Sequence, residues 1–295
     1  MKKTLLALAA VMAVGLAHAD TLKKIKDSGS ITLGARESSA LSFTVGDGKY
    51  TGFHTEMAKR IAADLQKQLG MSKLDIKWQP VTSQNRIPLV QNGTVDLECG
   101  STTNNRARAK DVAFAVTTYV EEVRIAVKAD SGIDNIDDLK GKTIATTTGT
   151  TSVQTLRKHK RAEGVDFKEV FGKDHSDSFL LLASGRADAF VMDGSILAAN
   201  ISKSKNPADF KIVGDVLNVE PIACMLRRDD PGFKKAVDDS IKGMIKSGEL
   251  AKLYDTWFMQ PIPPNNTKIG LPMSAATKDA WANPNDKPME DYAQK

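Results

Sequence analysis

Strand-like and helix-like segments alternate along this chain, and that alternation limits the folds open to it more than any other feature. Short apolar runs, such as 30–35 and 143–147, predict buried strands. Between them, residues 53–69 place Met57 and Ile61 on one face of an amphipathic helix. This βαβ order is typical of parallel sheets with flanking helices, so the sequence predicts an α/β fold. Further strands are expected at 75–81, 94–99, 123–128, 167–171, 187–192 and 211–216.

The length of the chain favours two domains. About 276 residues remain after a predicted leader, which exceeds the usual size of a single hydrophobic core. A long helical pattern begins at Pro231 and places Phe233 and Val237 on one side. Residues beyond Pro261 are rich in Pro, Asn and Asp, which favour turns, so we expect an irregular tail along the surface.

The first 19 residues predict a secretory signal peptide. Lys2 and Lys3 form a basic start, residues 5–16 are apolar, and a small-residue cleavage motif ends at Ala19. The apolar run is too short to span a membrane, and no second one follows. No cysteine stands at the cleavage point, so we expect cleavage after Ala19 and a free protein in the periplasm.

The charge pattern argues against a nucleic-acid partner. The chain carries a net charge of +5, which falls to +3 once Lys2 and Lys3 are removed. Basic and acidic residues alternate, as at Lys110 and Asp111, and such alternation is typical of solvated helix faces. No basic stripe is interleaved with aromatic residues, so we expect no nucleic-acid binding.

Cys99 and Cys224 are the only cysteines of the chain. In an oxidising compartment an isolated pair more often forms a disulfide than a metal site, so we expect these two to be bonded. Two buried, reduced thiols are the alternative, because the large sequence separation does not itself bring the residues together.

Polar side chains gather where the predicted strands end. Two hydroxyl-rich runs, 99–108 and 146–152, contain glycine and follow strands, so they offer backbone amides and hydroxyls to an anion. Either run alone is explained equally well by solvated loops and caps. In open parallel sheets, ligands bind beyond the carboxyl ends of the strands. The polar residues that follow six predicted strands are Arg36, Ser83, Arg86, Ser101, Thr147, Asp174, His175 and Asp193.

The chemistry of this set indicates an amino acid with two carboxylates. Arg108 and nearby hydroxyls suit one carboxylate, and Asp193 offers an acceptor to an ammonium group. Arg36, Arg86 and a protonated His175 exceed that need. Since buried charges must be paired, a second ligand carboxylate is expected. Taken singly, each arginine is explained equally well by a surface salt bridge, and His175 by a cap or a core position.

Longer motifs resemble a known family, the solute-binding proteins of polar amino-acid ABC importers (family 3), and most of all its glutamate- and aspartate-binding members. The motifs are SQNRIPL at 83–89, ECGSTTNN at 98–105, KDH at 173–175, DSF at 177–179 and CMLR at 224–227. The resemblance spans the mature chain. It implies a two-lobed type II periplasmic binding protein, each lobe a mostly parallel sheet flanked by helices, with two hinge strands between the lobes.

The resemblance also implies where the lobes divide. The hinge strands should lie near 119–123 and 216–221, and lobe 1 should then contain the bond between Cys99 and Cys224. The expected segments are a signal peptide at 1–19, lobe 1 at 20–120 and 217–270, lobe 2 at 121–216, and a C-terminal tail at 271–295.

The ligand contacts implied by the resemblance fall into three groups. The α-carboxylate should be held by Arg108, Thr103 and Thr150, and the α-ammonium by Ser101 and Asp193. The side-chain carboxylate should face Arg36, Ser83, Arg86, Thr147 and His175. Arg106, two residues before Arg108, stands where the family pattern has no arginine and competes with Arg108 for its role.

The expected ligands are therefore L-glutamate and L-aspartate. The resemblance implies a monomer that delivers them to the membrane subunits of an ABC permease, with no cofactor. His54, His159 and His175 do not have metal-ligand spacing, so no metal site is expected.

Two other functions remain open from the sequence. A periplasmic hydrolase or dehydratase on the same fold is one, although no nucleophile elbow, metal-binding helix motif or phosphate loop is present. An amino-acid sensor that presents its closed form to a receptor is the other, and it differs in its partner rather than in its ligand.

Overall fold

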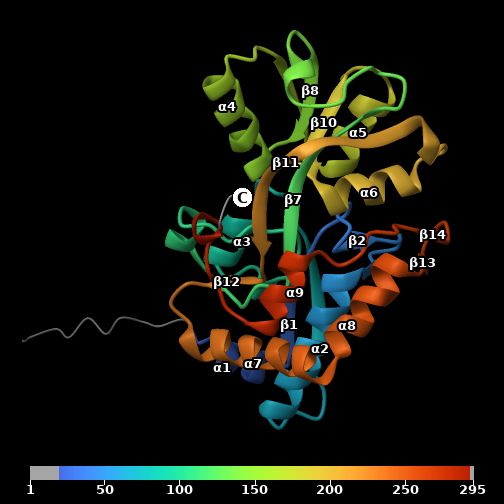
Figure 1. The fold of residues 1–295 in the computed structure, drawn as a ribbon. Helices are drawn as coiled ribbons and strands as arrows, with labels where there is room; N and C mark the ends of the chain where they lie inside the picture. The colour runs from blue at the N-terminus through green and yellow to red at the C-terminus, as the bar shows by residue number, and fades with distance from the viewer. Residues whose placement is uncertain (1–19, 293–295) are drawn as a thin grey trace, which may run out of the picture.

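The chain folds into two lobes joined by two long strands (Figure 1). The computed structural model describes residues 20–292, so the predicted signal peptide lies outside the described residues. Each lobe is built on a five-stranded sheet with apolar clusters on both faces. This architecture confirms the fold class predicted from the βαβ order. Within 20–292, no helix is both long and apolar enough to cross a membrane.

The sheet of lobe 1 combines an early and a late part of the chain. Its strands are β1 (Ser30–Ala35), β4 (Asp75–Pro80), β5 (Leu97–Glu98), β6 (Val112–Phe114) and β12 (Met225–Arg227). Their order is β4-β1-β5-β12-β6, in which β1 is parallel to both neighbours and β12 runs antiparallel to both of its own. Because β12 returns after lobe 2, lobe 1 is discontinuous in sequence.

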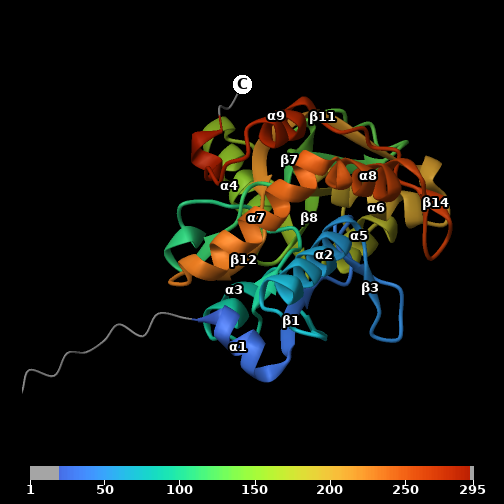
Figure 2. The same cartoon turned by 90° about the horizontal axis from the view of Figure 1, so that it is seen from below.

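Helices and a small hairpin surround this sheet. The helices are α1 (Thr21–Ser28), α2 (Phe53–Gln68), α3 (Arg86–Gln91), α7 (Pro231–Ser247) and α8 (Glu249–Tyr254), and the hairpin is β2 (Phe43–Thr44) with β3 (Tyr50–Thr51). α2 packs along α7 and α8 on one face (Figure 2). There Phe53, Met57 and Ile61 are fully buried, as the helical spacing of 53–69 predicts. Phe53 meets the rings of Tyr254 and Phe258, each at 5.9 Å.

A disulfide joins two strands of the lobe 1 sheet. Cys99 directly follows β5, Cys224 directly precedes β12, and their sulfur atoms are bonded. Both residues are buried. The predicted disulfide is thus confirmed. It links segments 125 positions apart in the chain, on either side of the excursion into lobe 2.

Lobe 2 has strand order β11-β7-β10-β8-β9. These strands are β7 (Tyr119–Lys128), β8 (Thr143–Thr147), β9 (Lys168–Gly172), β10 (Ala189–Asp193) and β11 (Phe210–Ile222), and the helices are α4 (Thr151–Glu163), α5 (His175–Ala183) and α6 (Gly194–Lys203). Successive residues of β7 face opposite sides of the sheet, since Ile125 packs in one apolar cluster with Leu156, and Ala126 in another with Phe179. The core of this lobe is therefore divided between two faces.

β7 and β11 form the connection between the lobes. They pair antiparallel, from Tyr119 opposite Ile222 to Lys128 opposite Phe210, with a register shift between Val213 and Asn218. The sequence predicts a strand at 211–216 followed by a hinge segment, whereas the structure has one long strand with an irregularity inside it. The two strands run side by side between the lobes in Figure 1.

The C-terminal segment is more ordered than the sequence indicates. It forms β13 (Pro261–Ile262), β14 (Thr267–Lys268) and the helix α9 (Ala275–Ala282), which lies against β7. The indole nitrogen of Trp281 donates to the carbonyl oxygen of Thr118 at 2.9 Å, and its ring stacks on Phe53. The expectation of an irregular tail is wrong for α9. Ser274 caps this helix, and burial of Trp281 stabilises it against lobe 1.

Candidate functional site

The predicted polar residues converge between the two lobes, at the carboxyl ends of the strands. Lobe 1 supplies residues that follow β1, β4 and β5, and lobe 2 supplies residues at the ends of β8, β9 and β10. All but Arg108 are buried. The residues brought together are Arg36, Ser83, Arg86, Ser101, Thr103, Arg108, Thr147, Thr150, His175 and Asp193.

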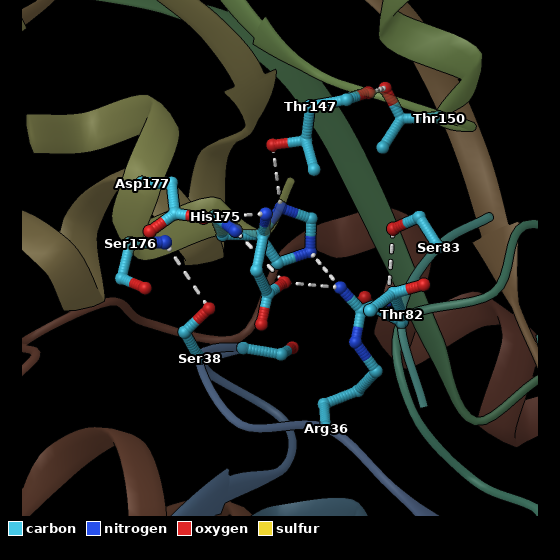
Figure 3. A network of polar contacts seen from close by, with 12 residues as sticks. Arg36, Ser38, Thr82, Ser83, Thr147, Thr150, His175, Ser176 and Asp177 are labelled. Carbon is cyan, nitrogen blue, oxygen red and sulfur yellow. Dashed lines mark hydrogen bonds and ion pairs between the residues drawn. The ribbon is translucent and has the colours of Figure 1, made fainter. Parts of the chain in front are cut away.

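The side chain of Arg36 makes three hydrogen bonds, two of which link lobe 1 to lobe 2 (Figure 3). Its side chain is fully buried, and one terminal nitrogen donates to Ser83 Oγ at 3.0 Å within lobe 1. The other donates to Asp174 Oδ1 and His175 Nε2 in lobe 2, both at 2.8 Å. Burial favours the protonated form of Asp174, but the charge of Arg36 and the hydrogen bonds from Arg36 and from the His175 amide outweigh it and lower the pKa of that carboxyl.

The bond from Arg36 determines which nitrogen of His175 carries the proton. A guanidinium only donates, so Nε2 accepts and Nδ1 donates to Thr147 Oγ1 at 3.0 Å. The Thr147 hydroxyl can then donate to Ser178 Oγ at 2.8 Å. Burial and the charge of Arg36 hold the pKa of His175 well below its ordinary value. The expectation of a protonated His175 is therefore wrong, because this ring lies beside a fixed cation without solvent.

Arg86 is buried, and its guanidinium has a hydrogen-bond donor without a partner in the described chain. One of its terminal nitrogens donates to the carbonyl oxygen of Ser101 at 2.9 Å, and its Nε has no partner among residues 20–292. Burial and the charges of Arg108 and Arg36 lower the pKa of Arg86 well below its ordinary value. Such a group is stabilised by any anion that reaches it.

Glu98 provides one nearby anion. Its Oε2 accepts from the Thr102 hydroxyl at 2.7 Å, whereas its Oε1 has no partner within the described chain. The residue at position 100 must be glycine for this packing, since a Cβ there would lie 2.1 Å from Glu98 Oε1. The loop that follows β5 is therefore shaped around the Glu98 carboxylate.

Asp193 ends β10 and precedes α6, with its side chain buried. Its Oδ1 has no hydrogen-bond partner in the described part of the chain. Burial, and next the charge of Glu220, raise the pKa of Asp193 to about 8. An ammonium group beside this carboxyl would supply both a donor and the missing positive charge.

Arg108 and Arg106 point to different parts of the molecule. Arg108 is half-buried and donates to the carbonyl oxygens of Thr103 at 2.9 Å and of Gly149, in lobe 2, at 3.3 Å. Arg106 is 65 % exposed and pairs with Asp291 at 2.5 Å. Of the two arginines that compete in the sequence, only Arg108 borders the space between the lobes.

The turn between β8 and α4 approaches lobe 1 closely. Gly149 has φ of +81°, and a Cβ there would lie 2.9 Å from the backbone of Gln84 in lobe 1. Thr150 precedes α4, and its hydroxyl donates to the carbonyl oxygen of Thr147 at 2.8 Å. Glycine at 149 thus permits the contact between lobes as well as the left-handed turn.

Sequence reasoning missed several buried carboxylates around the site. Glu98 precedes Cys99, and Glu121 and Glu220 lie opposite each other on β7 and β11. Each is almost fully buried. Burial and the charge of Asp193 raise the pKa of Glu121 well above its ordinary value. Their position in apolar strand patterns is the one available signal, because a charged residue is costly there unless it is paired.

The described residues contain no group of three or more His, Cys, Asp or Glu side chains arranged to hold a metal ion. His54 is instead a core residue, with its two ring nitrogens 2.7 Å from the carbonyl oxygen of Gly100 and 2.9 Å from Thr118 Oγ1. Burial lowers the pKa of His54 to about 4, so this ring is neutral.

Known proteins resemble the chain along most of its length. Residues 31–260 match the bacterial extracellular solute-binding proteins, family 3. The L-glutamate/L-aspartate-binding protein of Pseudomonas aeruginosa is 43 % identical over 272 residues, covering 92 % of this chain and 90 % of that protein. The glutamate/aspartate import solute-binding protein of Escherichia coli is 42 % identical, covering 95 % and 96 %. Among solved structures, a mutant of ArgBP from T. maritima superposes with a TM-score of 0.71 at 28 % identity, covering 82 % and 100 %.

Proposed function

Because the chain belongs to family 3 of the bacterial extracellular solute-binding proteins, we propose that it binds an acidic amino acid, L-glutamate or L-aspartate, between its lobes and delivers it to an ABC importer. One observation carries this proposal. Three arginines, Arg36, Arg86 and Arg108, converge with the buried Asp193 at the junction of the lobes. A ligand with two carboxylates and one ammonium matches that set in sign, with the carboxylates facing the arginines and the ammonium facing Asp193.

The roles of the residues follow from their surroundings. Arg108, Thr103 and Thr150 are proposed to hold the α-carboxylate near the amino end of α4, where backbone amides favour an anion. Asp193 and Ser101 take the α-ammonium. The side-chain carboxylate lies toward Arg36, Ser83, Arg86, Thr147 and His175, and neutral His175 accepts from Arg36 and keeps that guanidinium oriented.

Binding is proposed to close the lobes about β7 and β11. Lobe 1 would comprise 20–120 and 217–270, and lobe 2 would comprise 121–216, so that the ligand contacts both. A ligand shifts an equilibrium only by binding one state better, and contacts to both lobes exist only in the closed state. The closed monomer would then be recognised by the permease, in the periplasm, after removal of the signal peptide at Ala19.

Binding rather than catalysis is favoured by the relatives, which are named as binding proteins of amino-acid import. The proposed test is calorimetric titration of the mature, ligand-stripped protein with glutamate, aspartate, glutamine, asparagine and arginine. We expect one molecule of glutamate or aspartate per chain. Glutamine should bind at least about tenfold more weakly, because charge-assisted bonds contribute roughly 1.5–3 kcal/mol each.

Glutamine is the matched control in this panel, since it has nearly the shape of glutamate without the second charge. Comparable affinity for the two would contradict the proposal, as would a stable complex with arginine alone. Unchanged ligand recovered after prolonged incubation would separate a carrier from an enzyme.

A further inference from the structure

Glu220 lies at the crossing point between the lobes. It belongs to β11, is fully buried, and stands directly opposite Glu121 of β7. None of the roles proposed above uses it. A buried carboxylate on a connecting strand is costly unless nearby groups donate to it.

The donors come from both lobes and from β11 itself. Glu220 Oε2 accepts from the hydroxyl of Thr103 at 2.5 Å and from that of Thr151 at 2.6 Å. Glu220 Oε1 accepts from the side-chain amide of Asn218 at 2.9 Å. Thr103 belongs to the loop that follows β5, and Thr151 is the first residue of α4. One oxygen atom therefore joins lobe 1, lobe 2 and a connecting strand.

The two threonine bonds differ in what happens when the lobes separate. Thr103 is attached to β11 by the backbone as well, through a bridge to Ile222 and a hydrogen bond from the amide of Asn104 to the carbonyl of Pro221. The hydrogen bond from Thr103 to Glu220 therefore joins lobe 1 to the adjacent end of β11, and it can persist when the lobes separate. Thr151 moves with α4, so its bond to Glu220 requires α4 to lie against lobe 1.

The same carboxylate also affects the charges around the ligand. Glu220 is the main negative charge that stabilises protonated Arg108, against the effect of burial, which comes first in lowering the pKa of Arg108. Since the Thr103 hydroxyl donates to Glu220, its oxygen can only accept, so Thr103 would meet the α-carboxylate through its backbone amide and not through its hydroxyl. Glu220 therefore orients two residues that were assigned to the α-carbon end of the ligand.

We propose that Glu220 is a positioning residue for ligand retention: it holds Thr103 and Thr151 on one oxygen atom, and its bond to Thr151 forms only when the lobes close. This inference rests on the proposed function. The bond adds no contact to the ligand itself, and it stabilises the closed state from the strand that connects the lobes.

The test compares Thr151→Val with Thr155→Val in the mature protein. Both positions lie on α4 and both changes replace a hydroxyl by a methyl group, but among the described residues Glu220 accepts a hydrogen bond from Thr151 and none from Thr155. Association and dissociation rates for glutamate are measured by stopped flow. Thr151→Val should raise the dissociation rate about tenfold while the association rate changes less than about twofold, since the bond forms after encounter. Thr151→Ser should restore the wild-type rate.

A static role in folding predicts a different pattern. It would lower the melting temperature of the ligand-free Thr151→Val protein well below that of Thr155→Val, and that result would overturn the inference. Equal dissociation rates for the two variants would also overturn it. Glu220→Gln serves as a second variant, which should weaken retention and leave the ligand-free protein folded. If the wild-type protein binds no glutamate, the proposed function fails instead, and the two failures are distinguishable.

Discussion

The two lobes bring different ionisable groups to the junction between them. Lobe 1 contributes three arginines, Arg36, Arg86 and Arg108, whereas lobe 2 contributes the carboxylates of Asp174 and Asp193. Lobe 2 adds the amino ends of α4 and α5 and the neutral His175. The comparison teaches that neither lobe alone complements an acidic amino acid. The arginines match its carboxylates, and the ammonium group needs the opposite lobe.

The lobes also differ in how their cores are held together. Lobe 1 has one large apolar cluster with stacked aromatic rings and a second, smaller cluster, and a disulfide joins its early and late parts. Lobe 2 has two smaller clusters, one on each face of its sheet, and no cysteine. Lobe 1 is thus the more strongly constrained partner, and lobe 2 is expected to open locally at lower free energy.

The largest expected effect is on glutamate binding, and it tests whether an arginine at the junction matters more for binding than an exposed arginine of the same lobe. Arg108→Met should weaken glutamate binding by about 2–5 kcal/mol, because it leaves the ligand carboxylate without its charged partner. Arg106→Met should change binding by less than about 0.5 kcal/mol, since Arg106 is exposed and pairs with Asp291. Titration calorimetry on both variants measures this. Equal losses would remove the distinction between the two arginines.

A smaller effect tests the difference between the two cores. Removing the disulfide, by Cys99→Ala with Cys224→Ala, should lower the free energy of unfolding by about 2–4 kcal/mol, because the bond closes a long loop of the unfolded chain. Hydrogen exchange should accelerate in β5, β12 and α7, and remain unchanged in β8 and α4. Faster exchange confined to lobe 2 would contradict the assignment of the disulfide to the stability of lobe 1.

The smallest effect concerns the acid contributed by lobe 2. With the pKa of Asp193 raised to about 8 by burial and Glu220, the ligand-free carboxyl holds a proton at pH 7. An ammonium ligand needs the carboxylate, so binding releases a proton, and affinity should fall as the pH drops below 8. The expected slope is up to about tenfold, or roughly 1.4 kcal/mol, per pH unit. His175 does not contribute, because its pKa already lies well below this window.

Calorimetry in buffers of different ionisation enthalpy measures the number of protons released on binding. The Asp193→Asn variant should release no proton and should bind glutamate weakly at every pH. The sign for stability follows from the same shift. The folded carboxyl keeps its proton up to about pH 8, whereas the unfolded chain loses it near 3.8. The ligand-free protein should therefore lose stability as the pH rises between those values. Proton uptake on binding would be the opposite of this prediction.

Much of the fold and of the candidate site follows from local sequence patterns. The strands at 30–35 and 143–147 are short apolar runs, and the strand-end rule selects Arg36, Thr147 and Asp193 without further information. The location of each of these residues follows from the strand that precedes it in the chain, because parallel strands bring the residues after their carboxyl ends to the same edge of the sheet.

The features that escaped prediction depend on contacts between distant segments. Glu121 and Glu122 are adjacent and chemically alike, yet only Glu121 is buried, next to Ser195 of α6. The neutral state of His175 follows from its burial and from the charge of Arg36, 139 positions away. The helix α9 is rich in alanine and capped by Ser274, but the Pro- and Asn-rich residues around it hid that local signal, and its Trp281 packs on the surface of lobe 1.

The position of Trp281 gives the molecule an intrinsic optical probe. All three tryptophans of the chain, Trp78, Trp257 and Trp281, lie outside lobe 2, and Trp281 is bonded to Thr118 at the root of β7. Its indole therefore lies next to the segment about which the lobes would rotate, while the other two are distributed over lobe 1. Ultraviolet emission from this protein reports on lobe 1 and the base of the connecting strand, and leaves lobe 2 spectroscopically silent.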